Sequence, residues 1–320
     1  MNKLYQPKHL KIPSADWILE ASENNQPYVF NETIAIVVDV ALATHRPLLV
    51  SGNPGCGKSR LADAIAAVQG WSLLSMTMTS RTRLESLTAE VDQLRRLHDA
   101  QARPENSALK PDACYLKPGL FWWAFQPETA RYRGMDPSEA ETYQAHLPYR
   151  GIQGKEKSHA VLLIDEIDKA EPDLPNDLLE PLDQKQFDLP DGFQVHDKTY
   201  IKLSENIQLL TIITTNGERE LPQAFLRRCV LLRLPDPEPD KLVEIALKHF
   251  PKGNQPRIKA IADKFPDFRV EAKSQSRRPP GISEFLDAIN ACEQCGIEVS
   301  DKDDSVWKKI ENAVLVKGKT

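Results

Sequence analysis

The amino-acid sequence predicts an α/β fold, in which a parallel sheet is flanked by helices and followed by a small all-helical domain. Three observations predict this arrangement. An apolar run at 47–50 leads into a glycine-rich loop at 52–59, and helix-forming residues come next. Two more apolar runs, at 159–164 and 207–215, each lead into polar side chains, as expected for strands buried on both faces. The C-terminal part of the chain shows only helical patterns.

Length and composition set the broad class. A chain of 320 residues suggests two domains, and its 27% charged and 41% hydrophobic residues describe an ordinary globular protein. The net charge of -5 gives no electrostatic reason for nonspecific nucleic-acid binding, although a local basic groove would still allow it. The N-terminus lacks the apolar stretch of a signal peptide, and no run reaches about 18 apolar residues. We therefore expect a cytoplasmic protein without a membrane segment.

Residues 1–30 predict an irregular N-terminal arm, because Pro7, Pro13 and Pro27 prevent a long helix. A core domain is predicted from 31 to 236. Its first helix is capped by Asn31 and has apolar residues at helical spacing, namely Ile34, Val37, Val38, Ala41 and Leu42. The segment before the cap has two interpretations that the sequence leaves open. This segment consists of Tyr28, Val29 and Phe30. It forms either an apolar slot for an adenine ring or a contact that packs the arm onto the core.

The loop after the first strand fits G-x-x-x-x-G-K-[ST], the pattern of a phosphate-binding loop, so the predicted fold is a P-loop parallel sheet. Its glycines let backbone amides point at a phosphate chain, and the following helix adds partial positive charge. Lys58 would reach the β- and γ-phosphates, and the Ser59 hydroxyl would ligate Mg²⁺. The predicted nucleotide contacts are the loop and the arginine after it: Gly52, Asn53, Pro54, Gly55, Cys56, Gly57, Lys58, Ser59 and Arg60.

The stretch between the two phosphate motifs is the hardest to interpret. Residues 71–77 alternate loosely and predict a strand. One long helix is then predicted, with five apolar residues on one side: Leu84, Leu87, Val91, Leu94 and Leu97. Prolines interrupt residues 99–155, which we treat as an insert within the core. In it, the aromatic segment 119–125 predicts a buried helix rather than an exposed contact surface, because large aromatic side chains are costly to leave in water.

The second phosphate motif, at 159–166, is an apolar strand that ends in two carboxylates. At the carboxyl edge of a parallel sheet, Asp165 would hold Mg²⁺ and Glu166 would take the proton from the attacking water. The strand at 207–215 ends at Asn216, whose amide would orient that water against the γ-phosphate.

Two segments flank these strands. Pro190-Asp191-Gly192 is a turn signal that predicts a β-hairpin within 187–203. A short helix at 221–229 ends in Arg227 and Arg228. An arginine presented to a neighbouring subunit's γ-phosphate raises the rate of hydrolysis by roughly 10³ to 10⁵.

Alternating prolines at 235–239 predict a stiff linker, where we place the boundary to a helical lid domain at 237–320. Its helices are predicted at 241–250, 258–265, 283–295 and 306–316. Arg278 precedes one of these helices and is a further candidate nucleotide contact. Cys292 and Cys295 lie on one face of a predicted helix, and we expect buried thiols rather than metal ligands.

The order of these motifs resembles that of AAA+ ATPases, and the details are similar to the MoxR branch. Residues 164–170, Ile-Asp-Glu-Ile-Asp-Lys-Ala, are similar to that branch's I-D-E-I-N-R-A. Residues 178–187 resemble its A-L-L-E-A-M-Q-E-R-Q-V segment, and residues 226–229 stand where it has L-D-R-F. The resemblance covers about residues 28–316 and implies ATP and Mg²⁺ as ligands.

The resemblance also implies roles for single residues. The phosphate-loop and acidic residues keep the roles given above, and Asn216 matches the family's first sensor. Arg228 matches the finger arginine, but Arg227 replaces an acid, so which of the two acts stays open. The second sensor motif S-P-R is not found where Ile282-Ser283-Glu284 stands. Arg278 is the nearby candidate to replace it, and Arg277 is the alternative that stays open.

The resemblance further implies a homo-oligomer, a hexameric ring with nucleotide between subunits. It implies a protein partner such as a von Willebrand factor type A domain protein, and Mg-dependent ATP hydrolysis coupled to chaperone-like remodelling of that partner. Two alternatives stay open: a nucleic-acid-directed motor or defence-system ATPase, and a nucleotide-gated assembly scaffold. The acidic net charge speaks against the first. No aromatic-hydrophobic-glycine pore loop precedes residue 99, which speaks against a processive unfoldase.

Overall fold

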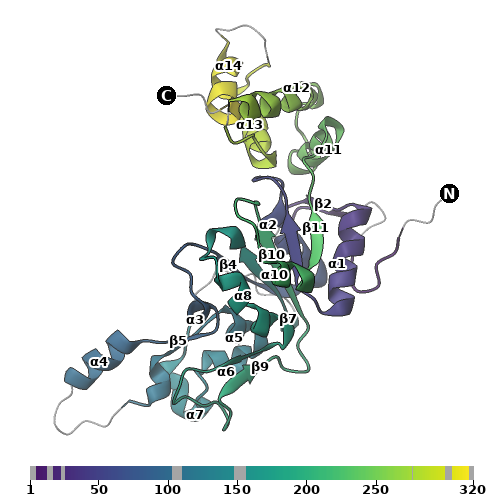
Figure 1. Ribbon diagram of the computed structural model, residues 1–320. Coiled ribbons are helices and arrows are strands. Elements are labelled where there is room, and N and C mark those ends of the chain that lie inside the picture. The colour runs from purple at the N-terminus through teal and green to yellow at the C-terminus, as the bar shows by residue number, and fades with distance from the viewer. Residues whose placement is uncertain are drawn as a thin grey trace. The chain divides into compact units, whose positions relative to one another are not determined.

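The computed structural model describes residues 5–12, 17–22, 26–102, 110–147, 156–275, 277–299 and 305–316. Five strands form the central sheet in the order β11-β3-β10-β7-β4 (Figure 1). They are β3 (Leu48–Ser51), β4 (Trp71–Thr77), β7 (Glu156–Asp165), β10 (Leu209–Thr215) and β11 (Val230–Arg233). This parallel sheet with flanking helices confirms the predicted α/β fold.

The central strands form as their composition predicts. β7 pairs parallel with β4 on one side and with β10 on the other. Every residue of β10 is buried, which agrees with an apolar strand that has neighbours on both faces. The strand predicted at 71–77 is confirmed, and the strand predicted at 207–215 is confirmed with a start at Leu209.

The chain divides into two compact units, which we describe separately. Unit 1 comprises Met1–Ile36, Val50–Val68 and Leu232–Thr320, and unit 2 comprises Val37–Leu49 and Gln69–Leu231. Two long helices, α1 (Glu32–Thr44) and α2 (Lys58–Gln69), contain residues of both units. In the part of the chain that the structure describes, no helix is long and apolar enough to cross a bilayer.

Unit 1 contains the helical C-terminal region. Its helices are α11 (Pro239–His249), α12 (Gln255–Ser274), α13 (Ile282–Cys295) and α14 (Val306–Ile310), with a π-helical turn at Glu311–Val316. A separate apolar core holds them together, and Phe265, Phe285 and Trp307 are fully buried in it. The expectation of two buried thiols is half wrong, since Cys292 is buried but Cys295 is exposed. Cys295 is the last residue of α13, where the helix face turns to solvent.

Unit 1 also contains a short N-terminal hairpin of β1 (Ile18–Leu19) and β2 (Tyr28–Val29), which pair antiparallel. Asn31 caps α1 as predicted, because its side-chain oxygen accepts the backbone N–H of Ile34 at 2.8 Å.

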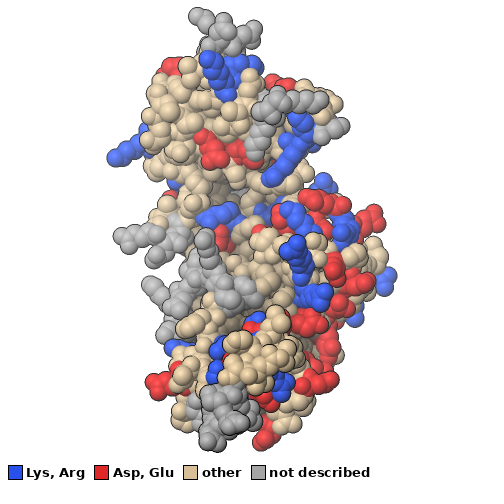
Figure 2. Space-filling model, turned by 90° about the vertical axis from the view of Figure 1, so that its left-hand side faces the viewer, with Lys and Arg blue, Asp and Glu red and all other residues tan. Residues whose placement is uncertain are grey.

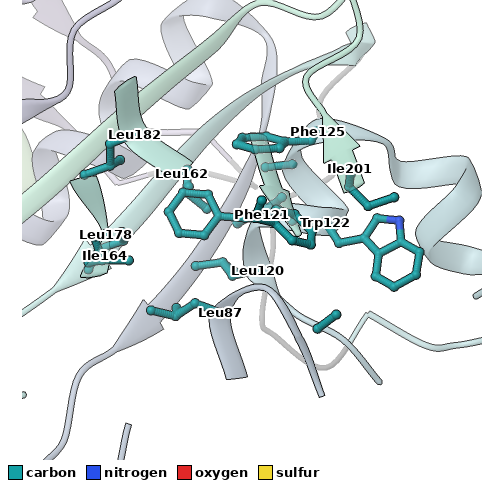
Figure 3. Packing of buried hydrophobic residues seen from close by; sticks show 14 of the residues in the cluster. Leu87, Leu120, Phe121, Trp122, Phe125, Leu162, Ile164, Leu178, Leu182 and Ile201 are labelled. Atoms are coloured by element: carbon teal, nitrogen blue, oxygen red, sulfur yellow. The ribbon is translucent and has the colours of Figure 1, made fainter. Parts of the chain in front are cut away.

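Unit 2 is built around a large apolar cluster that packs against β7 and β10. The predicted buried helix is confirmed as α5 (Leu120–Phe125), where Phe121, Trp122 and Phe125 are fully buried (Figure 3). The predicted hairpin is also confirmed, because β8 (Gln186–Asp188) pairs antiparallel with β9 (Tyr200–Lys202). Burial of three large aromatic rings explains why this insert folds onto the sheet.

The single long helix predicted after β4 is wrong. The chain forms α3 (Leu84–Leu87), then β5 (Ala89–Val91), then α4 (Gln93–Gln101). Helix α3 ends because β5 pairs antiparallel with β6 (Leu116–Pro118), a partner about 25 residues away that local periodicity does not reveal. Consequently Leu94 and Leu97 are not in the core but 82% and 56% exposed.

The remaining elements of unit 2 are short. Its helices are α6 (Pro127–Arg131), α7 (Pro137–Ala140), α8 (Leu174–Asp177), α9 (Leu179–Asp183) and α10 (Gln223–Arg228). Its 3₁₀ turns are η1 (Asp112–Tyr115), η2 (Glu141–Tyr143) and η3 (Ile167–Lys169).

Candidate functional site

The phosphate-type loop lies in unit 1, between β3 and α2. Gly55 and Gly57 have φ of 79° and 96°, a backbone region that L side chains rarely adopt. A Cβ on Gly52 would come within 2.6 Å of the Leu234 carbonyl oxygen, so this position also requires glycine. The backbone of the turn therefore requires glycine at these three positions.

Lys58 is the first residue of α2 and is only 6% exposed. Its Nζ donates to the carbonyl oxygens of Gly52 at 2.9 Å and Asn53 at 3.0 Å. An ammonium group has three donors, so these two contacts fix Lys58 over the loop with one more donor available to an anion. The N-terminus of α2 adds partial positive charge beside it.

A cavity of about 230 Å³ adjoins this loop within unit 1. Gly55, Cys56 and Gly57 line one side of it. Its apolar lining comes from four elements and the linker: Tyr28, Val29, Ile34, Leu234, Ile245 and Leu286. We call this space the loop pocket. It has the apolar lining and the few polar groups typical of small-ligand sites.

The sequence left two interpretations for the segment before α1, residues 28–30, and each one holds for part of it. Tyr28 and Val29 line the loop pocket, whereas Phe30 is 2% exposed and absent from its lining. The Tyr28 and Phe30 rings contact each other edge-on with centroids 4.9 Å apart. The buried Phe30 therefore supports the pocket wall that Tyr28 forms.

Burial shifts three titratable groups of the loop pocket toward their neutral forms. Burial raises the pKa of the Cys56 thiol and of the Tyr28 hydroxyl. Burial, with the charge of Arg60 as a smaller cause, lowers the pKa of His249 from its ordinary 6.5. The cations that line the pocket each pair with an acid: Arg60 with Asp63, Lys241 with Glu244 and Lys248 with Glu20.

The start of α13 touches the loop within unit 1. The Ile282 backbone N–H donates to the Gly55 carbonyl at 2.8 Å. A Cβ on Gly281 would lie 2.7 Å from the Gly55 Cα, so the two backbones pack with no room for a side chain. Arg278 is exposed and does not line the loop pocket.

Two residues of unit 1 that sequence reasoning missed fix the linker in place. Asp236 accepts a hydrogen bond from the Asn53 side chain at 2.7 Å. Arg269 is 9% exposed and donates to the carbonyls of Pro237 at 3.1 Å and Pro280 at 3.3 Å. Burial lowers the pKa of Arg269. No motif signals these two residues.

The second predicted set lies in unit 2, where β7 and β10 end side by side. We call it the acidic cluster: Asp165, Glu166, Asp168, Lys169, Thr214 and Asn216. Glu166 has left-handed backbone with φ of 59°, a conformation that a non-glycine residue adopts at some cost. Its Oε1 accepts from Asn216 Nδ2 at 3.1 Å, and its Oε2 accepts from Lys169 Nζ at 2.7 Å. The hydrogen bond to Glu166 raises the pKa of Lys169.

Thr214 and Asp168 complete the cluster, and sequence reasoning missed both. The Thr214 hydroxyl donates to Asp165 Oδ1 at 2.5 Å and accepts the Glu166 backbone N–H at 2.8 Å. Asp168 accepts the backbone N–H groups of Asn216 and Glu218. Asp168 stands where the quoted family pattern has asparagine, and this difference is the signal in the sequence that could have identified it.

The two candidate finger arginines differ in their contacts. The Arg228 guanidinium is paired with the Asp183 carboxylate and donates to the Ala224 carbonyl at 3.0 Å. The Arg227 side chain is exposed. The Arg46 guanidinium donates to the carbonyls of both arginines and of Cys229, which fixes the end of α10.

Comparisons with known proteins agree with these motifs. Residues 47–229 match the model of the AAA domain family, dynein-related subfamily. The chain is 32% identical over 116 residues to "Lon protease homolog 2, peroxisomal" of Zea mays, a match that covers 34% of this chain and 12% of that protein. It is 45% identical over 47 residues to "Midasin" of Giardia intestinalis, covering 15% of this chain and 1% of that protein. The chain thus corresponds to a small fraction of the length of these relatives.

The family match spans more than half of the chain, from before β3 to the end of α10. It includes both the phosphate-type loop and the acidic cluster. The match confirms the predicted resemblance at the level of AAA+ ATPases and does not extend to the MoxR branch. On these grounds the chain belongs to the AAA domain family, dynein-related subfamily.

Proposed function

We propose that this chain hydrolyses ATP with Mg²⁺ as a MoxR-like AAA+ ring and uses the energy to remodel or activate a protein partner. Family membership supports nucleotide binding and oligomeric assembly. The single observation that carries the hydrolysis proposal is the contact between Glu166 Oε1 and Asn216 Nδ2 at 3.1 Å. A carboxylate and an amide held together at the ends of adjacent parallel strands suit activation of a water molecule.

In this proposal the loop pocket binds the nucleotide. The backbone amides of the loop and the remaining donor of Lys58 bind the phosphates. The apolar wall of Tyr28 and Val29 takes the adenine ring, because an uncharged base needs contact area rather than charge. The pKa shifts of His249 and Cys56 support this role, since both favour the uncharged forms of side chains that line the pocket.

The donor set suits Mg²⁺. Asp165 and Ser59 would supply one carboxylate and one hydroxyl, and Mg²⁺ uses few protein ligands beside water and phosphate oxygens. When bound, Mg²⁺ neutralises charge on the phosphate oxygens. Thr214, which donates to Asp165 Oδ1, would hold that carboxylate in one orientation.

The chain's own residues then divide the reaction between them. Glu166 accepts the proton of the attacking water, and Asn216 orients that water. Arg228 acts on the nucleotide of a neighbouring subunit, and Arg227 is the alternative for this role. The contact of Arg228 with Asp183 supports a resting position from which the guanidinium moves on assembly.

A protein rather than a nucleic acid is the proposed partner, and a von Willebrand factor type A domain protein is the expected kind. Nucleic acids are bound through clusters of Lys and Arg. On the face that Figure 2 shows, basic side chains are interspersed with acidic ones. The net charge of -5 supports the same choice.

Phosphate release by the purified chain tests this function. We expect ATP turnover with Mg²⁺, none in EDTA, and none for Glu166→Gln. A pull-down with Glu166→Gln, which should retain ATP and its partner, would identify that partner. If added DNA raises ATP turnover and no added protein does, the nucleic-acid motor is favoured instead. Full cellular function of Glu166→Gln would favour the assembly scaffold.

A further inference from the structure

Asp168 is a buried carboxylate to which the proposed hydrolysis mechanism assigns no role. Its side chain is 3% exposed, and it lies in the 3₁₀ turn two residues after Glu166. Burying a carboxylate costs free energy unless hydrogen bonds compensate for the lost water. The groups that donate to it therefore indicate what it does.

Among the residues that the structure describes, the hydrogen bonds of Asp168 all come from the loop that follows β10. Its Oδ2 accepts the backbone N–H of Asn216 at 3.1 Å and that of Glu218 at 3.0 Å, and Oδ1 lies 3.4 Å from the Asn216 nitrogen. The N–H between them, on Gly217, donates to Thr215 Oγ1 at 3.0 Å. Three successive backbone amides are thus tied to side-chain oxygens, which fixes the conformation of the loop.

The same loop carries the amide that contacts Glu166. Asn216 is held by its backbone at Asp168 and donates with its side chain to Glu166 Oε1. An asparagine side chain has only two torsions between backbone and amide. Once the Asn216 backbone is fixed, few rotamers remain, and the one observed reaches the carboxylate.

We propose that Asp168 is a positioning residue, which holds the backbone of Asn216 so that the Asn216 amide reaches the Glu166 carboxylate. This inference rests on the proposed ATP hydrolysis for its kinetic consequence. In this role Asp168 acts through Asn216 rather than directly on the nucleotide or the attacking water. Its loss should therefore change the rate of the chemical step and leave ATP binding unchanged.

The geometry supplies a conservative variant. Oδ2 alone makes both short contacts, at 3.0 and 3.1 Å. In Asp168→Asn the amide oxygen can take the place of Oδ2 and accept both N–H groups, whereas Asp168→Ala leaves both without an acceptor. Asp168→Asn should therefore restore most of the rate that Asp168→Ala loses.

The kinetic test measures kcat and KM for ATP. We expect Asp168→Ala to lower kcat by roughly 10- to 100-fold, since small misplacements of catalytic groups have effects of that size. The KM should stay within about twofold of wild type. Asp168→Ala combined with Asn216→Ala should be no slower than Asn216→Ala alone, because both changes remove the same contact.

A matched control separates positioning from general loss of stability. Asp39 is also 3% exposed and lies in α1, outside the acidic cluster. Asp39→Ala should lower the melting temperature without lowering kcat at a temperature where the protein is folded. A fall in kcat for Asp39→Ala equal to that for Asp168→Ala would contradict a specific role.

Hydrogen exchange provides a readout that does not need turnover. The amides of residues 216 and 218 should exchange faster in Asp168→Ala than in wild type, and at near wild-type rates in Asp168→Asn. Unchanged exchange in Asp168→Ala, or additive losses of kcat in the double variant, would overturn the proposal. If wild type neither binds nor hydrolyses ATP, the proposed function fails, and the exchange rates still decide whether Asp168 holds the loop.

Discussion

Glu166 is the residue on which the proposed chemistry depends, and side chains of its own unit bind both of its carboxylate oxygens. Asn216 contacts Oε1 and Lys169 contacts Oε2. Its left-handed backbone, with φ of 59°, is held by the hydrogen bond from its N–H to Thr214. These contacts fix one orientation of the carboxylate, which lowers the reorganisation needed for proton transfer.

The two contacts on Glu166 should differ in how much they contribute to kcat. The Lys169 and Glu166 side chains are 42% and 29% exposed, and ion pairs that open to solvent contribute only about 0.2–1 kcal/mol. We therefore expect Lys169→Met to lower kcat by at most about fivefold, with Lys169→Arg close to wild type. Asn216→Ala should cost more, about 100-fold, because it also removes the donor that orients water. Equal losses in steady-state assays of the two variants would contradict this ranking.

Motif patterns identified some members of the cluster and missed others for a physical reason. Lys58, Glu166 and Asn216 follow from local patterns, since Lys58 belongs to the phosphate-loop motif and the other two stand directly after recognisable strands. The contacts of Thr214 depend on how β10 aligns with β7, with Ile213 opposite Ile164. A register between strands about 50 residues apart is not encoded in local spacing, so Thr214 could not be assigned from the sequence.

At the scale of elements, α13 begins directly on the phosphate-type loop. Ile282 donates to the Gly55 carbonyl, and the Gly281 backbone packs against the Gly55 backbone. Arg269 and Asp236 hold the neighbouring linker. Within unit 1, the loop that would bind phosphates and the start of a lid helix are therefore tied through the backbone.

This packing makes Gly281 a sensitive position. Gly281→Ala would place a Cβ 2.7 Å from the Gly55 Cα, so the helix start or the loop must move. We expect destabilisation by about 1–3 kcal/mol and weaker ATP binding, measured by chemical unfolding and nucleotide titration. Gly296→Ala is the matched control at the other end of α13, where φ is 62° but nothing lies within 4 Å. It should lower stability and leave ATP affinity unchanged. Equal effects of the two variants on affinity would refute the role of the close contact.

Elements with their own burial signal could be predicted, and elements that depend on distant pairing could not. The run of aromatic residues gave α5 correctly, and the stretch rich in leucine, isoleucine and threonine gave β10. Leucine spacing suggested a helix through Val91, but pairing of β5 with β6 outweighs the local preference. Leu94 and Leu97 keep their helical spacing in α4 while facing solvent.

At the scale of the whole molecule, the central sheet has the strand order β11-β3-β10-β7-β4. The family match over residues 47–229 includes every strand of that sheet except β11. The helical region beyond the linker lies outside the match, so its role as a lid and its boundary at residue 237 remain predictions.

Assembly into a ring predicts that subunits complement one another. Arg228→Ala should bind ATP normally and lose turnover, because the neighbouring nucleotide lacks its arginine. Glu166→Gln should also bind ATP and lose turnover, because the attacking water lacks its proton acceptor. Mixed in equal amounts, the two variants should regain part of the wild-type rate, because some interfaces then pair an intact Arg228 with an intact Glu166. Arg227→Ala serves as the comparison, since it is Arg228 and not Arg227 that pairs with Asp183. No recovery on mixing, or turnover lost only in Arg227→Ala, would contradict the assignment of Arg228.

The central claim is that the loop around Lys58 binds the triphosphate and that Glu166 drives its hydrolysis. The most direct measurement is ATP affinity and turnover for Lys58→Ala and Glu166→Gln side by side. We expect Lys58→Ala to lose ATP binding, and Glu166→Gln to bind ATP as wild type does while releasing no phosphate. Unchanged ATP affinity in Lys58→Ala, or wild-type phosphate release by Glu166→Gln, would contradict it.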